Sequence, residues 1–353
     1  MRRVLSAVIA CVTIPAIADI IPIPGSQRVK PAFDSSDLVC SGTVTAVRVR
    51  TFEVTTGNSL GLVSQQARAA IEVEQTYKEL TPPGRTIIVL TESEAPKSSS
   101  EYSIFREGDE FLVFLKVSPT GGYNLADPFL GATRFHSLPE QPRGQGLAKL
   151  QNLLAATLLS QNQEDVSTAL RLLEGFDNIA DHNLEIVSRL YSATKPAIAL
   201  AAIDVSLSAK TPESLAILVR YLDEYKGNAE PMALTNIGNR LADFRDPQSL
   251  PSIRRLARSR FLPIRQGAIR SLRARRDPRC IPELVERLDD SDGTIRYIAV
   301  ISLAETLGKY EGDYAPSMYL FDKKPQYYTD LWKKWWDDEG SKLYPPNDPA
   351  VPQ

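Results

Sequence analysis

The sequence predicts a multidomain α+β protein, in which a small N-terminal β-barrel or sandwich is followed by an all-α solenoid. In residues 67–78, apolar and polar side chains alternate, as in a strand with one buried face. Residues 246–307 contain two segments that match at a constant offset of 31 residues. The matching pairs are Asp246 and Asp277, Pro247 and Pro278, Ile264 and Ile295, and Arg265 and Arg296. Such a period holds two helices and indicates a solenoid, in which each unit buries its apolar face against a neighbour.

Residues 1–18 have the pattern of a signal peptide. Arg2 and Arg3 form a positive start, residues 4–14 are an apolar run too short to span a bilayer, and Ala16-Ile17-Ala18 is a small-x-small cleavage site. The mature chain is therefore expected to begin at Asp19 and to be exported, to the periplasm or the extracellular space. An alternative reads residues 8–11 as a lipoprotein box, with lipid attached to Cys11. No transmembrane segment is expected in the mature chain.

A Pro-rich lead-in, residues 19–36, precedes the predicted β domain, residues 37–138. Strand patterns occur at residues 38–50, 67–78, 86–91, 111–117 and, more weakly, 123–126 and 132–136, with turn residues between them. Residues 51–66 lack a clear period and are expected to form an exposed hairpin loop. This number and spacing of short strands indicates a small barrel or sandwich.

Three segments of this domain resemble the OB-type barrel of netrin-like modules, the class that includes tissue inhibitors of metalloproteinases. They are DLVCSGTVTAV (37–47), ARAAIEVEQTYKEL (67–80) and FREGDEFLVFLK (105–116). In those inhibitors an N-terminal cysteine cluster meets the metal of the target, and this sequence has no such cluster, so protease inhibition is not expected. The resemblance implies a barrel that binds on its surface or along a strand edge. Because Cys40 and Cys280 fall in different predicted domains, two free buried thiols are expected rather than a disulfide.

After a predicted linker at residues 139–146, leucine stripes at helical spacing continue through residues 147–340. The segments LPIRQGAIRSL (262–272) and GTIRYIAVISLAETLG (293–308) resemble the second helix of HEAT repeats, specifically the short class found in bacterial proteins and phycobilisome lyases. The resemblance implies stacked helix pairs in which Arg265 and Arg296 bond to carboxylates or carbonyls of adjacent turns. The alternative role for these two arginines is ligand contact. A further unit begins at Thr211 with an offset of 35 residues, and its extra residues are expected in a loop.

The last helix is predicted at residues 329–340, with Trp332, Trp335 and Trp336 on one broad face. A solenoid needs its last apolar face covered, so we assign these tryptophans to a cap. The alternative is a platform for stacking sugars. Residues 341–353 contain four prolines and are expected to be disordered.

Residues 240–279 contain twelve arginines and three aspartates, in a chain of net charge -2. If Arg254, Arg255, Arg258, Arg270 and Arg273 share one face of the solenoid, they form a candidate binding surface for an anionic envelope component. We favour pairing with acids of neighbouring units, including Glu283, Glu286 and Asp290, because stacked repeats bring opposite charges close. Export argues against a nucleic-acid partner.

Catalytic chemistry has little support in the sequence. The two histidines are isolated, no zinc-binding spacing, phosphate-binding loop or nucleophile elbow is present, and neither catalytic residues, metal ligands nor a cofactor are expected. The sequence therefore favours an exported, non-enzymatic binding or scaffold protein whose solenoid contacts an unknown protein partner. The alternatives are an envelope enzyme or enzyme accessory with an unrecognised site, and a binder of anionic envelope polymers through the arginine-rich repeats.

The predicted leader gives a direct test. Protein isolated from the cells that make it should have Asp19 at its N-terminus and lack residues 1–18, as measured by N-terminal sequencing and intact mass. A chain found in the cytosol with Met1 in place contradicts the prediction, and a lipid adduct on Cys11 supports the lipoprotein alternative.

Overall fold

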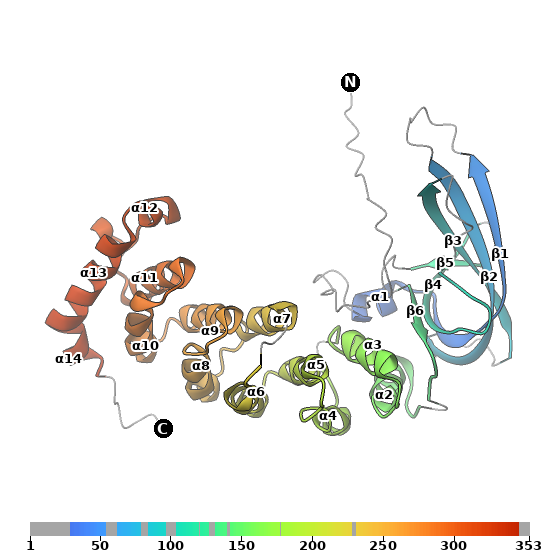
Figure 1. Ribbon diagram of the computed structural model, residues 1–353, viewed down its shortest axis with the longest axis horizontal. Helices are drawn as coiled ribbons and strands as arrows, with labels where there is room; N and C mark the ends of the chain where they lie inside the picture. Colours follow the sequence, from blue (N-terminus) through green and yellow to red (C-terminus); the bar gives the residue numbers. More distant parts are fainter. Residues whose placement is uncertain are drawn as a thin grey trace. The chain divides into compact units, whose positions relative to one another are not determined.

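The computed structural model describes residues 29–53, 62–78, 84–96, 104–119, 121–126, 131–139, 142–176, 178–227 and 231–345. Contacts divide the chain into two compact units, Met1–Asp177 and Asn178–Gln353, which Figure 1 shows as a β-rich part and a helical array. The predictions on the signal peptide, on Cys11 and on residues 346–353 lie outside the described residues. Within the described residues, no helix has the length and hydropathy required to cross a bilayer.

The first unit contains a closed β-barrel. Its strands are β1 (Leu38–Glu53), β2 (Leu62–Lys78), β3 (Thr86–Pro96), β4 (Glu110–Val117), β5 (Tyr123–Leu125) and β6 (Ala132–Phe135). The sheet has the order β1-β2-β3-β5-β4-β6, and β1 also pairs with β4, which closes a ring of five strands and leaves β6 on the far edge of β4. The predicted barrel is therefore present, and closure removes most of the free strand edges that an open sheet would expose.

The alternation predicted in β2 matches its burial. Ala67, Ala69, Ile71 and Val73 are buried, whereas the side chains between them are exposed or half-buried. The hairpin loop predicted at residues 51–66 was too long, because β1 continues to Glu53, which pairs with Val63 of β2. The physical reason is that backbone pairing extends past the barrel core, where side-chain alternation no longer signals a buried face.

Three helices pack on this barrel: α1 (Val29–Ser35), α2 (Gly146–Thr157) and α3 (Gln163–Leu173), which contact β4, β2 and β6 respectively. Helix α1 lies within the predicted lead-in, where no helical period of apolar residues was recognised. Its Val29, Ala32 and Phe33 are buried. The first two helices of the predicted solenoid thus belong to the same compact unit as the barrel.

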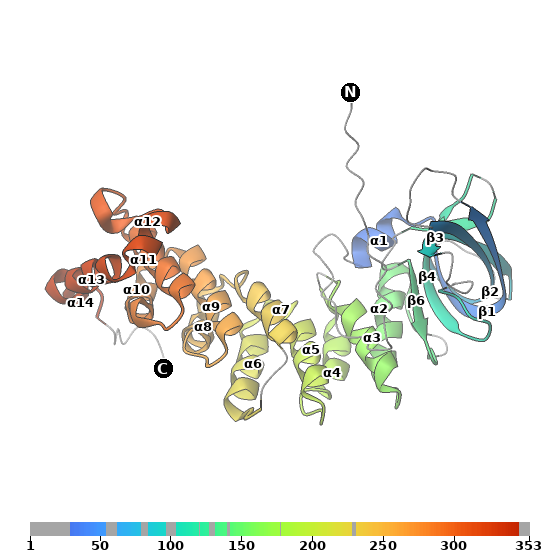
Figure 2. The ribbon, with the colours of Figure 1, turned by 45° about the horizontal axis from the view of Figure 1, so that its top comes forward.

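The second unit is a stack of helix pairs (Figure 2). Its helices are α4 (Asp181–Ser188), α5 (Pro196–Leu207), α6 (Pro212–Glu224), α7 (Pro231–Leu241), α8 (Leu250–Leu256), α9 (Leu262–Arg275), α10 (Ile281–Glu286), α11 (Gly293–Leu307), α12 (Met318–Lys323), α13 (Pro325–Trp335) and α14 (Ser341–Leu343). The second helices of successive pairs pack on one another, α5 on α7, α7 on α9 and α9 on α11, and the first helix α6 packs on α8. One apolar core runs from α5 to α13.

The offset of 31 residues is visible in the helix bounds. Short 3-10 helices, η1 (Pro247–Ser249) and η2 (Pro278–Cys280), lead into α8 and α10, and α9 and α11 begin at Leu262 and Gly293. The carboxylates of Asp246 and Asp277 accept hydrogen bonds from the backbone of Gln248 and Arg279, so the repeated Asp-Pro pair is an N-terminal cap.

The unit that begins at Thr211 corrects one prediction. Its extra residues mainly lengthen a helix instead of a loop: α6 has 13 residues, whereas its counterpart consists of the three residues of η1 and the seven of α8. Thr211 keeps the capping role of Asp246, since its hydroxyl accepts a hydrogen bond from the backbone N–H of Ser214 at 3.2 Å.

Helices α7 and α9 approach closely enough for backbone contact. A Cβ atom placed on Gly267 would lie 2.0 Å from the carbonyl oxygen of Gly238, and one on Gly238 would lie 2.3 Å from that of Pro263. Both positions therefore require glycine at this spacing. This contact fixes the separation of two neighbouring repeats through atoms that cannot be repacked.

The aromatic segment covers the end of the array. Trp332 and Trp335 are buried in the same core as α11, and the Trp332 indole N–H donates to the carbonyl oxygen of Tyr314 at 3.1 Å. Trp336 is partly buried against them. Their burial is that of a cap, because protein covers the rings that a sugar platform would have to expose. The helix begins earlier than predicted, at Pro325, and continues through a π-helix, Trp336–Gly340, into α14, three residues beyond the predicted end at 340. The disorder predicted for residues 341–353 is therefore wrong at its start, because residues 341–343 are helical and the ring of Tyr344 packs on Trp335.

Cys40 and Cys280 are both free and buried, as expected. Burial raises the pKa of each thiol to about 12, so neither is a nucleophile near neutral pH.

The cap yields a stability prediction. Trp332→Ala should lower the free energy of unfolding by about 3–5 kcal/mol, because it removes a fully buried indole. Urea unfolding followed by circular dichroism measures the change. The matched control is Tyr319→Ala on the neighbouring helix α12, where the side chain is 65% exposed and the effect should be within about 0.5 kcal/mol. Equal stabilities for the two variants contradict the assignment of Trp332 to a cap.

Candidate functional site

The five arginines predicted to bind an anionic component each contact a side chain of a neighbouring helix. Arg254 lies 3.0 Å from Glu283, Arg255 2.7 Å from Asp223, Arg258 2.6 Å from Glu286, Arg273 2.6 Å from Glu305, and Arg270 donates to Asn239 at 3.3 Å. Each contact joins one helix pair to the next. Four of the five arginines therefore pair with acids of adjacent units, and the partner of Arg270 is an amide.

Burial divides these pairs into two kinds. The side chains of Arg254 and Glu283 are 19% and 10% exposed, and burial raises the pKa of the Glu283 carboxyl above its usual value. By contrast, Arg258 and Glu286 are about half exposed, and the bidentate hydrogen bond from Arg258 lowers the pKa of Glu286. Exposed pairs contribute at most about 1 kcal/mol. Among the exposed pairs, the contact of Arg255 with Asp223 has no bidentate bond to hold it.

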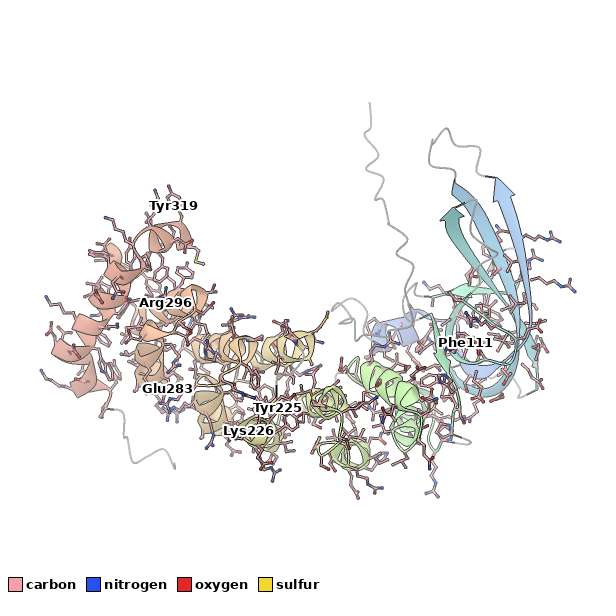
Figure 3. All side chains as sticks on the ribbon, viewed as in Figure 1. Phe111, Tyr225, Lys226, Glu283, Arg296 and Tyr319 are labelled. Atoms are coloured by element: carbon pink, nitrogen blue, oxygen red, sulfur yellow. The ribbon has the colours of Figure 1, made fainter. Side chains whose placement is uncertain are left out.

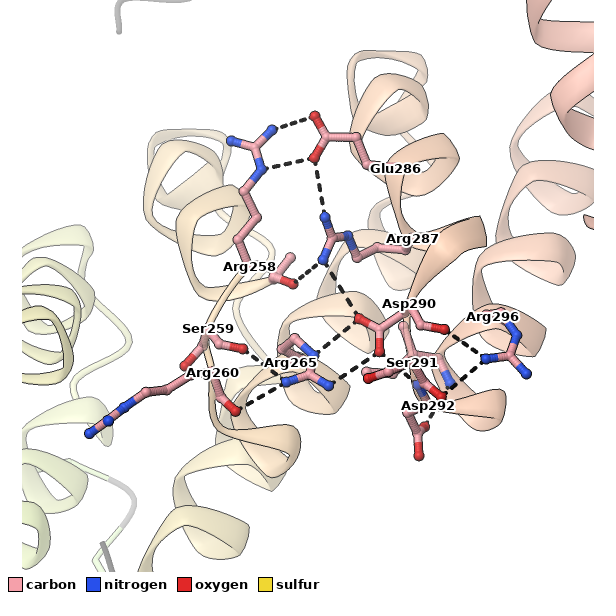
Figure 4. A network of polar contacts seen from close by, with 12 residues as sticks. Arg258, Ser259, Arg260, Arg265, Glu286, Arg287, Asp290, Ser291, Asp292 and Arg296 are labelled. Carbon is pink, nitrogen blue, oxygen red and sulfur yellow. Dashed lines mark hydrogen bonds and ion pairs between the residues drawn. The ribbon is translucent and has the colours of Figure 1, made fainter. Parts of the chain in front are cut away.

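The repeated arginines, Arg265 and Arg296, bind the turn between the two helices of their own unit (Figure 4). Arg265 donates to the carbonyl oxygens of Ser259 and Arg260, and Arg296 donates to those of Asp290 and Ser291, each 31 residues further on. This is the carbonyl bonding that their repeat position implied.

Arg265 also crosses to the next unit. Its guanidinium forms two hydrogen bonds with the carboxylate of Asp290, at 3.0 and 3.2 Å, and the side chains are 14% and 3% exposed. Arg287 lies 3.6 Å from the same carboxylate. The buried carboxylate therefore connects two successive turns. This network orders the stack, which leaves ligand binding to other residues.

A pocket lies between the C-terminal ends of α6 and α8, with a volume of about 390 Å³. Its apolar lining consists of Leu222 and Leu256, which are buried, and of Val219 and Tyr225, which are half-buried. The ring of Tyr225 stacks on that of Tyr221 at 5.6 Å between centroids. An aromatic wall held by its neighbours offers a rigid contact surface.

The charged lining of the pocket is mainly basic: Lys226, Arg255, Arg258 and Arg260 against Asp223. Arg260 donates to the carbonyl oxygens of Tyr225 and Gly227 at 2.7 and 2.8 Å, so it holds the chain that follows α6. Figure 4 shows its side chain pointing away from Arg265. Lys226 is exposed and has no ion pair or hydrogen bond with any residue that the structure describes; Figure 3 shows it beside Tyr225. The pocket thus combines an apolar floor with an excess of positive charge.

The described residues contain no group of three or more His, Cys, Asp or Glu side chains arranged to hold a metal ion. In the first unit, His136 is held by the buried Asp165, whose carboxylate accepts hydrogen bonds from the backbone N–H of His136 at 2.9 Å and of Ser137 at 3.3 Å. That contact ties β6 to α3 and is structural.

Residues 228–304 match the family model for HEAT repeats. The helical array is a HEAT-like solenoid. No curated protein matches the chain. Among solved structures, the chain is similar to one engineered protein with 16% identity and a TM-score of 0.30, covering 45% of this chain and 80% of that one. It is similar to a second with 15% identity and a TM-score of 0.31, covering 55% of each.

Part of the pocket escaped the sequence analysis. Arg255 and Arg258 were among the predicted binding residues, whereas Lys226, Tyr225 and Arg260 were not. Lys226 precedes the arginine-rich stretch, and it reaches the pocket only because α6 and α8 of the HEAT-like solenoid pack side by side. An available signal was the offset of 35 residues, which marks the irregular junction where the pocket lies.

The buried Arg265–Asp290 pair gives a second stability prediction. Arg265→Ala should lower the free energy of unfolding by about 3 kcal/mol, because it leaves the Asp290 carboxylate buried without its bidentate partner. The control is Arg270→Ala on the same helix, which is exposed and should change stability by no more than about 0.5 kcal/mol. Chemical denaturation of both variants measures the difference. A loss for Arg265→Ala no greater than that of the control would show that the network does not order the stack.

Proposed function

We propose that this protein is an exported, non-enzymatic scaffold that binds a protein partner on its HEAT-like solenoid. The observation that carries the proposal is the stack of α6 to α11, of which residues 228–304 match HEAT repeats. HEAT repeats generally mediate protein interactions, because stacked helix pairs present a long surface without requiring a pocket for each contact.

The charge arrangement supports a protein partner over an anionic polymer. A polymer would need a row of available cations along the solenoid, but the predicted binding arginines mostly connect neighbouring repeats. Protein interfaces instead use a few aromatic, arginine and apolar side chains grouped at one place. The pocket between α6 and α8 has that composition.

The proposed location outside the cytoplasm is supported by the signal-peptide pattern of residues 1–18. The β-barrel then serves as a second module of the exported chain, which contributes its own surface. In this arrangement the solenoid determines the partner.

Photo-crosslinking in the producing cells tests the proposal. A photoreactive amino acid replaces Arg220 on α6 or Met232 on α7, both exposed on the solenoid, and Thr45 on β1 as the control position in the barrel. We expect a discrete crosslinked protein from at least one solenoid position, identified by mass spectrometry. Absence of a crosslinked protein at the solenoid positions, or the same crosslinked product only at Thr45, contradicts a scaffold that binds through its helices.

A further inference from the structure

The pocket between α6 and α8 has the features of a recognition site for a particular kind of peptide. We propose that it binds an acidic segment of the partner protein, in which one or two carboxylates flank an apolar side chain. The inference rests on the proposed scaffold function and adds the chemistry of the partner. It concerns side chains of the second unit alone.

The lining of the pocket combines apolar and basic side chains. Leu222, Leu256 and Tyr225 form an apolar floor and wall, and the cations stand beside it. A free inorganic anion would gain no binding energy from the apolar half of the pocket, whereas an apolar side chain would bury its surface there. A volume of about 390 Å³ accommodates more than one side chain of an extended peptide.

Two of the four cations in the lining are already bound by groups of the protein. Arg258 is engaged by both oxygens of Glu286, and Arg260 is engaged by two carbonyl oxygens. Lys226 and Arg255 remain for a ligand: Lys226 has no partner among the described residues, and the side chain of Arg255 is 66% exposed. Two cations from different elements of one lining, Lys226 after α6 and Arg255 on α8, fit carboxylates that flank a central side chain.

The pocket already contains one carboxylate of the protein, that of Asp223. Asp223 lies 2.7 Å from Arg255, and its side chain is 46% exposed. An exposed pair is weak enough for a carboxylate of the partner to replace Asp223. Asp223 therefore competes with the ligand, which gives its removal an effect opposite in sign to that of removing a cation.

Binding is tested with the full chain and three labelled probes, measured by fluorescence polarisation at low salt. The first probe is an eight-residue peptide of alternating glutamate and leucine, the second has glutamine in place of glutamate, and the third has serine in place of leucine. We expect the first to bind at least about tenfold more tightly than either of the others, with weaker binding as salt is raised.

The variants identify the pocket. Lys226→Gln and Arg255→Gln should each weaken the first probe about three- to tenfold, a range of roughly one charge-assisted contact, and Asp223→Asn should strengthen it. Arg270→Gln, an exposed arginine outside the lining, is the matched control and should have no effect. Circular dichroism and melting temperature confirm that each variant is folded.

Three results of the peptide assay overturn the proposal. They are no binding of the glutamate-leucine peptide, binding that Lys226→Gln and Asp223→Asn leave unchanged, and tight binding of tripolyphosphate in place of the peptide. A crosslinked partner that the Lys226→Gln and Arg255→Gln chains retain at full yield also overturns it, while the scaffold function stands. Loss of the crosslinked partner from the unsubstituted chain is a failure of the scaffold function itself.

Discussion

The solenoid depends on burial that its helices share. Helices α8 and α10 have seven and six residues, far below the roughly 12–15 at which an isolated helix becomes marginally stable in water. Each exists because Leu250, Ile253 and Ile281 enter a core that neighbouring units also line. The same requirement explains the aromatic cap, since the last unit has no following repeat to cover it. The close approach of α7 and α9 at Gly238 and Gly267 sets how tightly two of these units stack.

Charge in this array mainly fixes register. Apolar side chains tolerate sliding of one helix along another, but a bidentate pair such as Arg265 with Asp290 is satisfied at one position only. Its burial makes misalignment costly, because each charge would be left without a partner in a dry environment. The exposed Arg255–Asp223 pair lacks that penalty. Arginine thus fixes the register of the stack where it is buried, and it can bind a ligand where it is exposed.

Periodicity made the regular part of this structure predictable. The matching residues 31 apart located the repeated segments that form α9 and α11, because similar local sequence in neighbouring units forms similar local contacts. The resemblance to HEAT repeats implied the carbonyl contacts of Arg265 and Arg296. The capping role of Asp246 and Asp277 was not predicted. Features that depend on lateral packing carried no such signal. Helix α1 is short and preceded by prolines, and it packs against strand β4 of the barrel. The pocket likewise requires Lys226 and Arg255 to meet from two helices.

The irregular junction explains why the pocket lies where it does. From Thr211 the first helix follows the pattern of the later units, but it continues to Glu224, past the position equivalent to the end of α8 at Leu256. The added residues bring Tyr225 and Lys226 beyond the end of the neighbouring helix, and Arg260 holds them there through the carbonyl oxygens of Tyr225 and Gly227. In a regular repeat these side chains would have no equivalent. The insertion leaves the core unchanged and adds a basic and aromatic rim that Arg260 holds in place. It thereby places a specific contact on an otherwise uniform stack.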